Sequence, residues 1–216
     1  MELYAPPPGF VPTYTWATKP ATLPTGQPVF ISNVGTKGSY WYYDGTRWKL
    51  VNGSVILAAL DTTMSGIVNS ETLALQYLMP ATLWQLKDRI RVTFTFTKSG
   101  TTDSGTVRIR IGTAGTTGDG QMNNNSETIL NAASRQAGLV QEYRLETATT
   151  VQMMSVANGA LAVSGYSGSG ASAAVGATAV GNVSNALYVS LFALSSSTND
   201  TVSVVDAQIE LRTTPN

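Results

Sequence analysis

A strict alternation of polar and apolar side chains in the middle of the chain constrains its fold more than any other feature. Residues 89–97 read RIRVTFTFT and residues 106–111 read TVRIRI. Successive side chains of a strand point to opposite faces of a sheet, so this period predicts two strands with one buried face each. Even-numbered residues of the first and odd-numbered residues of the second should face the core. The loop sequence KSGTTDSG between them predicts that the two strands pair antiparallel with each other.

Apolar patterning predicts further strands on both sides of this central pair. The continuous apolar run VILAAL at 55–60 predicts a strand that is buried on both faces. Near the C-terminus, Val202 and Val204 are followed by Val205 and Ala207, so the apolar residues change parity and predict a β-bulge between 204 and 205. The remaining strands are predicted at 29–31, 141–146, 149–156, 186–194 and 202–212.

Helical patterns are scarce. A short helical turn is predicted at 80–85, because Pro80 can begin a helix at a position where its missing N–H costs nothing. For residues 123–138, a helix capped by Ser126 and a strand both stay open. The sequence therefore predicts an all-β protein.

An aromatic cluster surrounds an Asp-Gly dipeptide in GSYWYYDGTRWKLVNG, residues 38–53. Asp44 and Gly45 favour a two-residue type I′ turn, which needs a positive φ at both positions. In that register Trp41 lies directly opposite Trp48 on one face of a hairpin. The aromatic rings are then expected to hold the two strands together. A sugar-stacking platform on the outer face is the alternative.

Seven of the nine prolines lie in residues 1–28. Their spacing disfavours helix and central strand and predicts an extended path. Large apolar side chains are interleaved with the prolines, which is uncommon in a solvated linker. We therefore predict a docking arm that lies on another subunit or on the structure to which the protein attaches, with packing on its own domain as the alternative. The predicted docking residues are Leu3, Tyr4, Phe10, Tyr14 and Trp16.

The composition argues against several functional classes. Lys and Arg number 13 and so do Asp and Glu, so the basic excess typical of a nucleic-acid-binding protein is missing. With no His and no Cys, the chain lacks the commonest metal ligand, the usual proton-transfer residue near neutral pH and a thiol nucleophile. Charged residues make up only 12%, which predicts a surface that partner chains partly cover. The sequence contains no apolar stretch of membrane-spanning length and no signal-peptide pattern at its N-terminus, so we expect assembly in a cytoplasm.

The remaining groups predict no catalytic residue, no metal site and no cofactor. Carboxylates fall mainly on the polar faces of predicted strands, as Glu142 and Glu210 do. The loop at 118–127 is rich in oxygen ligands but lacks the regular spacing of a calcium loop, so turn structure explains it better. Aromatic side chains are the binding chemistry that is left, either for a host-surface glycan or for burial in an interface. The candidates are Trp16, Trp41, Tyr43, Trp48, Tyr166 and Tyr188.

Two stretches resemble virion proteins of tailed bacteriophages. Residues 26–58, with the phrases DGTRW and VNG, resemble the hairpin module of tail-fibre and other virion proteins of phages and prophages. Residues 80–122, followed by TATTVQMM at 147–154, resemble the jelly-roll head that often follows this module. The resemblance covers most of residues 26–156. Many fibres place a long shaft before these modules, whereas this chain has only the proline-rich arm.

The proline pattern predicts the docking arm at 1–28, and the resemblance implies a β-hairpin module at 29–53 and an antiparallel jelly-roll β-sandwich at 54–216. It also implies a homotrimeric virion component without enzymatic activity, assembled in the host bacterial cytoplasm and attached to other virion proteins through the arm. Nucleic acid and membrane insertion are not expected. The expected function is that of a tail fibre or receptor-binding protein. A capsid decoration or head-fibre (cement) protein is the alternative, and a glycan-cleaving enzyme is a distant third.

Overall fold

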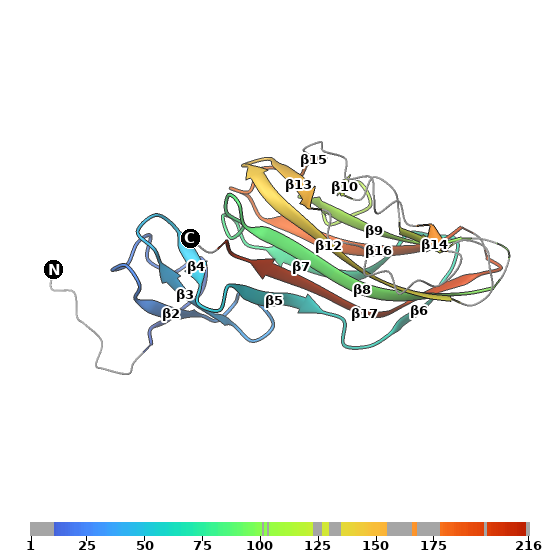
Figure 1. The fold of residues 1–216 in the computed structure, drawn as a ribbon, viewed down its shortest axis with the longest axis horizontal. Coiled ribbons are helices and arrows are strands. Elements are labelled where there is room, and N and C mark those ends of the chain that lie inside the picture. The colour runs from blue at the N-terminus through green and yellow to red at the C-terminus, as the bar shows by residue number, and fades with distance from the viewer. Residues whose placement is uncertain are drawn as a thin grey trace.

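The chain folds into a small N-terminal sheet and a larger two-layered body that lie end to end (Figure 1). The computed structural model describes residues 11–100, 102, 104–122, 127–129, 135–154, 166–167, 178–196 and 198–214. These residues form strands, turns and loops without a helix, so the all-β prediction is confirmed. We call residues 11–53 the N-terminal module and the body that follows the sandwich.

The N-terminal module is a four-stranded sheet with the order β1-β2-β3-β4. The first two strands are parallel, and the other pairs are antiparallel. Its strands are β1 (Thr13–Tyr14), β2 (Pro28–Ile31), β3 (Ser39–Tyr43) and β4 (Trp48–Leu50). The described part of the proline-rich segment, 11–28, therefore packs on its own module, which is the alternative that the sequence leaves open.

The sandwich has the jelly-roll topology that the resemblance implies. Its seven-stranded sheet consists of β5 (Ser54–Ala59), β6 (Met64–Ile67), β8 (Arg89–Ser99), β12 (Arg135–Thr147), β13 (Thr150–Met154), β15 (Thr178–Ala179) and β17 (Thr201–Arg212). Its six-stranded sheet consists of β7 (Thr72–Met79), β9 (Gly105–Gly112), β10 (Gly120–Gln121), β11 (Glu127–Ile129), β14 (Tyr166–Ser167) and β16 (Leu187–Ser195). The central orders are β12-β8-β17-β5 and β11-β9-β16-β7, with every neighbouring pair antiparallel. Two sheets of four strands interleaved along the chain in this way form a jelly roll.

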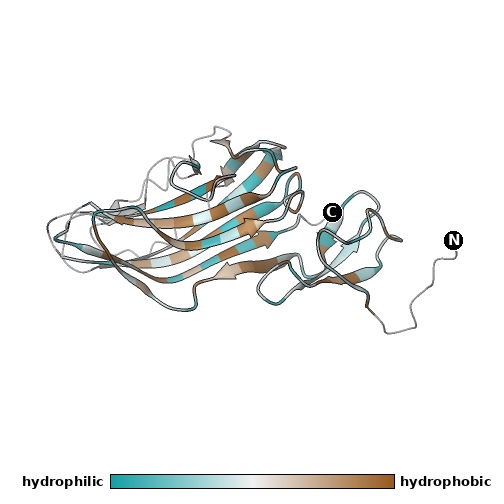
Figure 2. Ribbon diagram, turned by 180° about the vertical axis from the view of Figure 1, so that it is seen from behind, coloured by the Kyte–Doolittle hydropathy of each residue, from teal (hydrophilic) through white to brown (hydrophobic). Residues whose placement is uncertain are grey.

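The core lies between the two sheets and follows the predicted alternation, which Figure 2 shows as alternating polar and apolar bands along the strands. The inward residues of the central strands are fully or almost fully buried: Ile90, Val92, Phe94, Phe96, Val107, Ile109, Ile111, Val189, Leu191, Ile209 and Leu211. The predicted bulge is also confirmed, because the pairing of β17 with β8 shifts between Val204 and Asp206. The side chain of Val205, at the bulge, is 40% exposed.

The predicted pairing of the two alternating strands is wrong. β8 pairs with β12 and β17 in one sheet, whereas β9 pairs with β10, β11 and β16 in the other. The chain therefore crosses from one layer to the other between residues 99 and 105. Alternation identifies the buried face of a strand but not its hydrogen-bonded neighbour, so two consecutive strands of this pattern can equally face each other across the core.

The apolar run at 55–60 is not buried on both faces. It forms β5, the terminal strand of its sheet, and Ile56 is 41% exposed. A register shift between Ile209 and Glu210 on the partner strand lets consecutive residues Leu57 and Ala58 both turn toward the core. The irregularity at a bulge, not burial on two faces, accounts for the continuous apolar sequence.

The predicted hairpin between β3 and β4 exists, but its two-residue turn is wrong. Tyr43 pairs with Trp48 and Trp41 pairs with Leu50, so the loop consists of the four residues 44–47. The change of register is two residues, which preserves the side-chain faces. Trp41 and Trp48 therefore share a face as predicted, although they are not cross-strand partners.

The loop is longer because the side chain of Asp44 organises it. One carboxylate oxygen of Asp44 accepts hydrogen bonds from the backbone N–H groups of Thr46 and Arg47, both at 2.8 Å. Gly45 has a φ of +99°, and it is the one loop residue with a positive φ. Because the Asp44 side chain satisfies the amides of the loop, this four-residue loop does not need the second positive φ that a type I′ turn demands.

The helical turn predicted at 80–85 is not found, and the described residues of 123–138 contain no helix either. Residues 80–88 form consecutive turns in which Thr82 and Lys87 have positive φ values of 63° and 70°. Within 123–138, the described residues belong to β11 and β12, so strand is the correct alternative there. Residues 123–126 and 130–134 lie outside the described part.

A buried ion pair stabilises the end of the sandwich far from the N-terminal module. Lys98, near the end of β8, lies 2.6 Å from Asp200, which precedes β17, and both side chains are at most 1% exposed. The Lys98 ammonium also donates to the carbonyl of Gly100 at 2.8 Å, and the Asp200 carboxylate accepts from the Thr102 amide at 3.2 Å. These contacts join the β8–β9 and β16–β17 loops.

Candidate functional site

The tryptophans that the sequence singles out form the core of the N-terminal module. Trp41 is fully buried, and Trp16 and Trp48 are each 5% exposed. The Trp16 and Trp41 rings meet edge to face with centroids 5.0 Å apart. The Trp41 indole N–H donates to the hydroxyl of Ser39 at 2.7 Å. The prediction that these three rings contact a receptor or a partner chain is therefore wrong, because buried rings offer no surface to either.

The other candidate aromatic residues are not gathered into one site. Tyr43 is partly buried beside Trp48, with ring centroids 5.9 Å apart. Tyr188 lies on the outer face of the six-stranded sheet, and Gly115 of a neighbouring loop approaches its ring so closely that an added Cβ would lie 2.9 Å from it. Of Tyr166 the structure describes the backbone in β14, and its side chain lies outside the described part.

The predicted docking residues also divide. Leu3, Tyr4 and Phe10 lie outside the described residues. Tyr14 belongs to β1 and packs against the core of the module, and Trp16 is buried in that core. The docking role predicted for Leu3, Tyr4 and Phe10 therefore stays a prediction.

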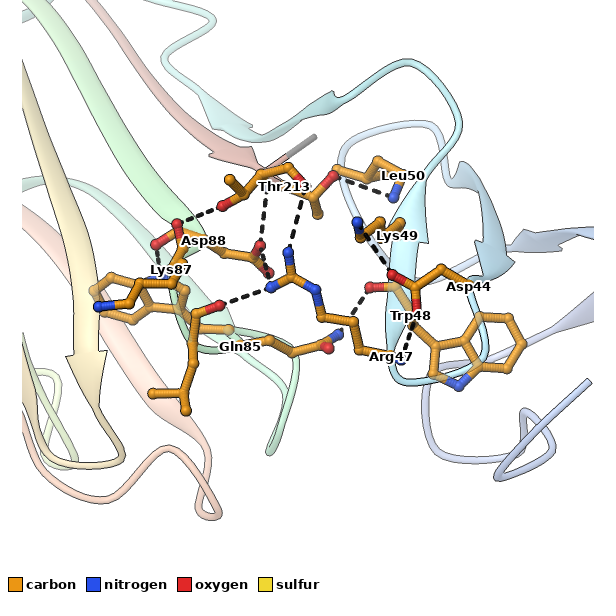
Figure 3. Close-up of polar contacts among 12 residues, drawn as sticks. Asp44, Arg47, Trp48, Lys49, Leu50, Gln85, Lys87, Asp88 and Thr213 are labelled. Carbon is orange, nitrogen blue, oxygen red and sulfur yellow. Dashed lines mark hydrogen bonds and ion pairs between the residues drawn. The ribbon is translucent and has the colours of Figure 1, made fainter. Parts of the chain in front are cut away.

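A network of polar contacts joins the N-terminal module to the sandwich, and we call it the junction (Figure 3). It consists of the β3–β4 loop, the turns at 80–88 and residues 213–214 after β17. Arg47 spans it: one terminal guanidinium nitrogen donates to the Leu86 carbonyl at 2.7 Å and contacts the Asp88 carboxylate at 3.3 Å. The other donates to the Thr214 carbonyl at 3.3 Å. A single side chain thus connects the module to two segments of the sandwich that are distant in sequence.

Further hydrogen bonds surround this contact. The Gln85 amide donates to the Trp48 carbonyl at 3.0 Å, and the Trp16 indole N–H donates to the Ala81 carbonyl at 3.0 Å. The Leu50 amide donates to the Thr213 hydroxyl at 3.3 Å. Because each bond crosses between module and sandwich, the two parts are held in one relative orientation.

Asp88 is the electrostatically unusual group of the junction. Its side chain is 1% exposed, and one carboxylate oxygen is buried without a hydrogen-bond partner. The other oxygen accepts from the Thr214 amide at 3.1 Å and faces Arg47. Burial raises the pKa of Asp88 to about 6, and the Thr214 amide and the charges of Arg47 and Lys49 only partly oppose this rise.

Asp44 lies on the module side of the junction and behaves in the opposite way. The backbone N–H of Arg47 is the main cause that lowers the pKa of Asp44 to about 2, with Thr46 and Lys49 contributing. The ammonium group of Lys49, itself 2% exposed, lies 3.1 Å from the Asp44 carboxylate. Asp44 is therefore ionised across the physiological pH range, and it organises the loop that carries Arg47.

A cleft of 390 Å³ opens beside the junction. It is lined by the turn at 52–53, by Ser54 and Arg89 at the starts of β5 and β8, and by the chain that leaves β17 from Arg212. Arg89 and Arg212 both contact Glu142, whose side chain is 6% exposed. The cleft is therefore a recess between the two parts of the protein with two arginine side chains on its wall.

Exposed apolar side chains mark a different surface. Ile56 on β5, and Leu73 and Leu78 on β7, are 41%, 37% and 48% exposed. These strands end their respective sheets and contact each other, so they form one edge of the sandwich. An apolar sheet edge that remains exposed invites association.

The described residues hold no group of three or more His, Cys, Asp or Glu side chains that could bind a metal ion. Within the same residues, no helix has the length and apolar character needed to cross a membrane.

No family model, curated protein or solved structure matches this chain.

The junction and the cleft are structural features that the sequence alone does not reveal. Arg47 belongs to the predicted hairpin, and Asp88 immediately precedes a predicted strand, but no spacing rule connects them. Arg89 and Arg212 each stand at the polar end of a strand, where arginine is ordinary. Only the antiparallel register of β8 and β17 brings them together.

Proposed function

We propose that this chain is a structural protein of a tailed-bacteriophage virion and that it acts, without enzymatic activity, as a homotrimeric tail fibre or receptor-binding protein. The observation that carries the proposal is the role of the DGTRW phrase, residues 44–48. Asp44 closes the loop, Arg47 spans the junction and Trp48 lies in the core of the module. The phrase on which the resemblance depends thus joins a small β module to a jelly roll, which is the module order that the resemblance implies.

The arrangement of the ends supports an attachment role. The N-terminal module lies at one end of the sandwich, whereas the β8–β9 and β16–β17 loops lie at the other (Figure 1). In the proposed function, residues 1–10 dock on neighbouring virion proteins and the far loops point outward to the host surface. The rigid junction would then fix the direction of those loops relative to the virion.

The exposed edge supports the proposed trimer. Ile56, Leu73 and Leu78 would be covered if copies of the chain packed side by side along β5 and β7. Covering this edge would also account for the low charge content of 12%. Light scattering coupled to size-exclusion chromatography should give three times the chain mass of 22.8 kDa.

A substitution at the edge tests the assembly. Leu78→Lys should shift the mass toward one chain, because a charge in a buried interface core is unfavourable. Val51→Lys is the matched control, since Val51 is 50% exposed but lies on the N-terminal module. A monomeric parent protein, or equal effects of both variants, would refute the trimer through this edge.

The position of the protein in the particle tests the function itself. Gold-labelled antibodies against the purified chain should label the tail tip of the phage, and the purified chain should compete with the phage for adsorption to host cells. Labelling of the capsid, together with binding to emptied capsids, would instead assign the chain as a decoration protein. Particles without label would refute both virion roles.

A truncation tests the docking arm. A chain that lacks residues 1–10 should fold and form the same oligomer, because the described core of the module begins after them, but it should no longer enter particles. Removing residues 1–28 would be a poorer test, since it also removes β1 and the buried Trp16. Normal incorporation of the chain without residues 1–10 would contradict the docking role.

A further inference from the structure

The cleft beside the junction places two arginines over one recess. Arg89 and Arg212 are direct cross-strand partners on β8 and β17, so their side chains project from the same face of the sheet. Their side chains are 39% and 43% exposed, which leaves both guanidinium groups accessible to solvent. The cleft they line has a volume of 390 Å³, near the lower end of the range for small-molecule sites, and it lies where two structural units meet.

The charged side chains around the cleft leave an excess of positive charge. Glu142 lies 2.8 Å from Arg89 and 3.5 Å from Arg212. Arg91 and Glu210 form the next cross-strand pair along the same face, and Glu210 lies 4.0 Å from Arg212.

Arg144, the cross-strand neighbour of Arg89 on β12, and its ion-pair partner Glu146 add one charge of each sign, and Lys87 beside Glu146 adds a positive charge. The cations around the cleft therefore outnumber the carboxylates, which favours an anion. A dianionic phosphate would be less well matched, because the two neighbouring carboxylates would repel its second charge.

Both arginines retain hydrogen-bond donors for a ligand. A guanidinium group carries five N–H donors. The ion pairs of Arg89 involve one terminal nitrogen, and those of Arg212 involve one terminal nitrogen and Nε. An incoming carboxylate can therefore accept charge-assisted hydrogen bonds without displacing Glu142.

Neutral polar groups complete the lining. The Asn52 amide and the Ser54 hydroxyl make no side-chain hydrogen bond within the described residues, and both line the cleft. An amide and a hydroxyl can each donate and accept, which suits the hydroxyl groups of a sugar. An apolar acid would gain no hydrogen bonds from these two groups.

Hydrogen bonds within the chain fix the wall of the cleft in the absence of a ligand. The Gly53 carbonyl accepts from the Thr213 amide at 2.9 Å, and the Thr213 hydroxyl accepts from the Leu50 amide at 3.3 Å. Gly53 has a φ of +73°, which allows the turn to close against the end of β17. Such a preformed wall lowers the entropy cost of binding.

We propose that this cleft binds the carboxylate of a monoanionic sugar acid, with the carboxylate on Arg212 and Arg89 and the sugar hydroxyls on Ser54 and Asn52. The site lies beside the N-terminal module and away from the far loops, so it is separate from the proposed receptor contact. It does not depend on the virion assignment, because its ligand chemistry follows from the lining residues alone.

Titration of the full-length protein with galacturonate, followed by isothermal calorimetry and by the melting temperature, tests this site. Galacturonate should bind and raise the melting temperature, whereas galactose, which has the hydroxyls without the carboxylate, should do neither. Arg212→Gln should weaken galacturonate binding on the order of tenfold or more, because it removes charge-assisted hydrogen bonds. Ser54→Ala should weaken it by a smaller factor.

The matched control is Arg108→Gln, which changes an arginine of the opposite sheet that contacts Glu71 at 2.8 Å. This variant should bind galacturonate like the parent protein. Equal losses in both arginine variants, or undiminished binding in Arg212→Gln at an unchanged melting temperature, would overturn the site. Tighter binding of acetate, of phosphate or of a short Glu-Asp peptide than of galacturonate would overturn the assignment to a sugar acid.

Discussion

Replacing Asp88 with asparagine should stabilise the protein at neutral pH, although it removes a buried ion pair. The pKa of Asp88 is about 6 in the folded chain, whereas the ordinary pKa of an aspartate, which applies in the unfolded chain, is 3.8. A raised pKa in an acid means that the folded state binds the proton more tightly, so the contribution of Asp88 to stability is largest below pH 3.8. It falls as the pH rises to about 6 and stays constant above. Over this window the loss amounts to about 3 kcal/mol.

Asparagine resembles the protonated form of this residue. Its carbonyl can accept from the Thr214 amide and from Arg47, as one oxygen of Asp88 does. Its amide takes the place of the buried oxygen that has no hydrogen-bond partner. At pH 7.5 the free energy of unfolding of Asp88→Asn should therefore exceed that of the parent by up to about 3 kcal/mol. At pH 4 the two proteins should have nearly equal stability.

Urea unfolding at pH 4, 6 and 7.5, followed by tryptophan fluorescence at one protein concentration, measures this difference. Asp206→Asn is the control, because Asp206 is exposed at the bulge of β17, and it should change little at any of these pH values. Breaking a buried ion pair normally costs about 3–5 kcal/mol. A loss of that size in Asp88→Asn at pH 7.5, shrinking toward pH 4, would show that the attraction of Arg47 exceeds the cost of burying Asp88, and the reasoning here would be refuted.

Three further substitutions test the packing and the backbone. Lys98→Met should lower the free energy of unfolding, measured by chemical denaturation, by about 3 kcal/mol, because it removes the ammonium partner of the buried Asp200 carboxylate. Lys37→Met is the control: Lys37 is exposed, so this change should alter the free energy of unfolding by less than about 0.5 kcal/mol. Trp16→Ala should cost about 3–5 kcal/mol in the same assay, and a small effect would mean that the N-terminal segment does not pack in the module as described. Thr82→Gly should raise the melting temperature, with a gain of up to about 1 kcal/mol, since it relieves a positive φ at an exposed β-branched residue; a lower melting temperature would indicate that the backbone is not strained there.

Local patterns predict the faces of the strands well and their partners poorly. The alternation at 89–97 and 106–111 correctly identifies which residues are buried, and the parity change correctly identifies the bulge near Val205. Both depend on the two-residue period of a single strand. The pairing of the same two strands depends on where the other six strands of the jelly roll lie. The sequences of the two segments themselves do not specify this arrangement.

The hairpin shows a similar limit at shorter range. Asp44-Gly45 correctly indicates a turn, but the number of loop residues depends on whether the Asp44 side chain satisfies the amides of Thr46 and Arg47. The role of the aromatic residues around this turn is also ambiguous in the sequence. The same aromatic residue types occur in ligand-binding sites and in hydrophobic cores. The tertiary contact of the Trp16 ring with the Trp41 ring shows that these two rings belong to the core.

The sequence does not predict the junction or the cleft, because their residues are far apart along the chain. Arg47 and Asp88 are separated by 41 positions, and Thr214 lies a further 126 beyond Asp88. Each residue has an ordinary local explanation in its own segment. Tertiary contact alone turns these ordinary residues into a site.

The proposed sugar-acid site and the junction should be thermodynamically coupled. A ligand in the cleft would contact Asn52 and Ser54, which connect the module to the sandwich, together with Arg212 at the end of β17. Such a ligand binds best when module and sandwich are docked, so it must stabilise the docked arrangement by the ratio of its affinities for the two states. By the same linkage, a change that weakens docking must lower the apparent affinity of the cleft in proportion to the fraction of docked protein that is lost. Because the junction fixes the direction of the far loops relative to the N-terminal module, occupancy of the cleft should reduce the movement of these loops relative to that module.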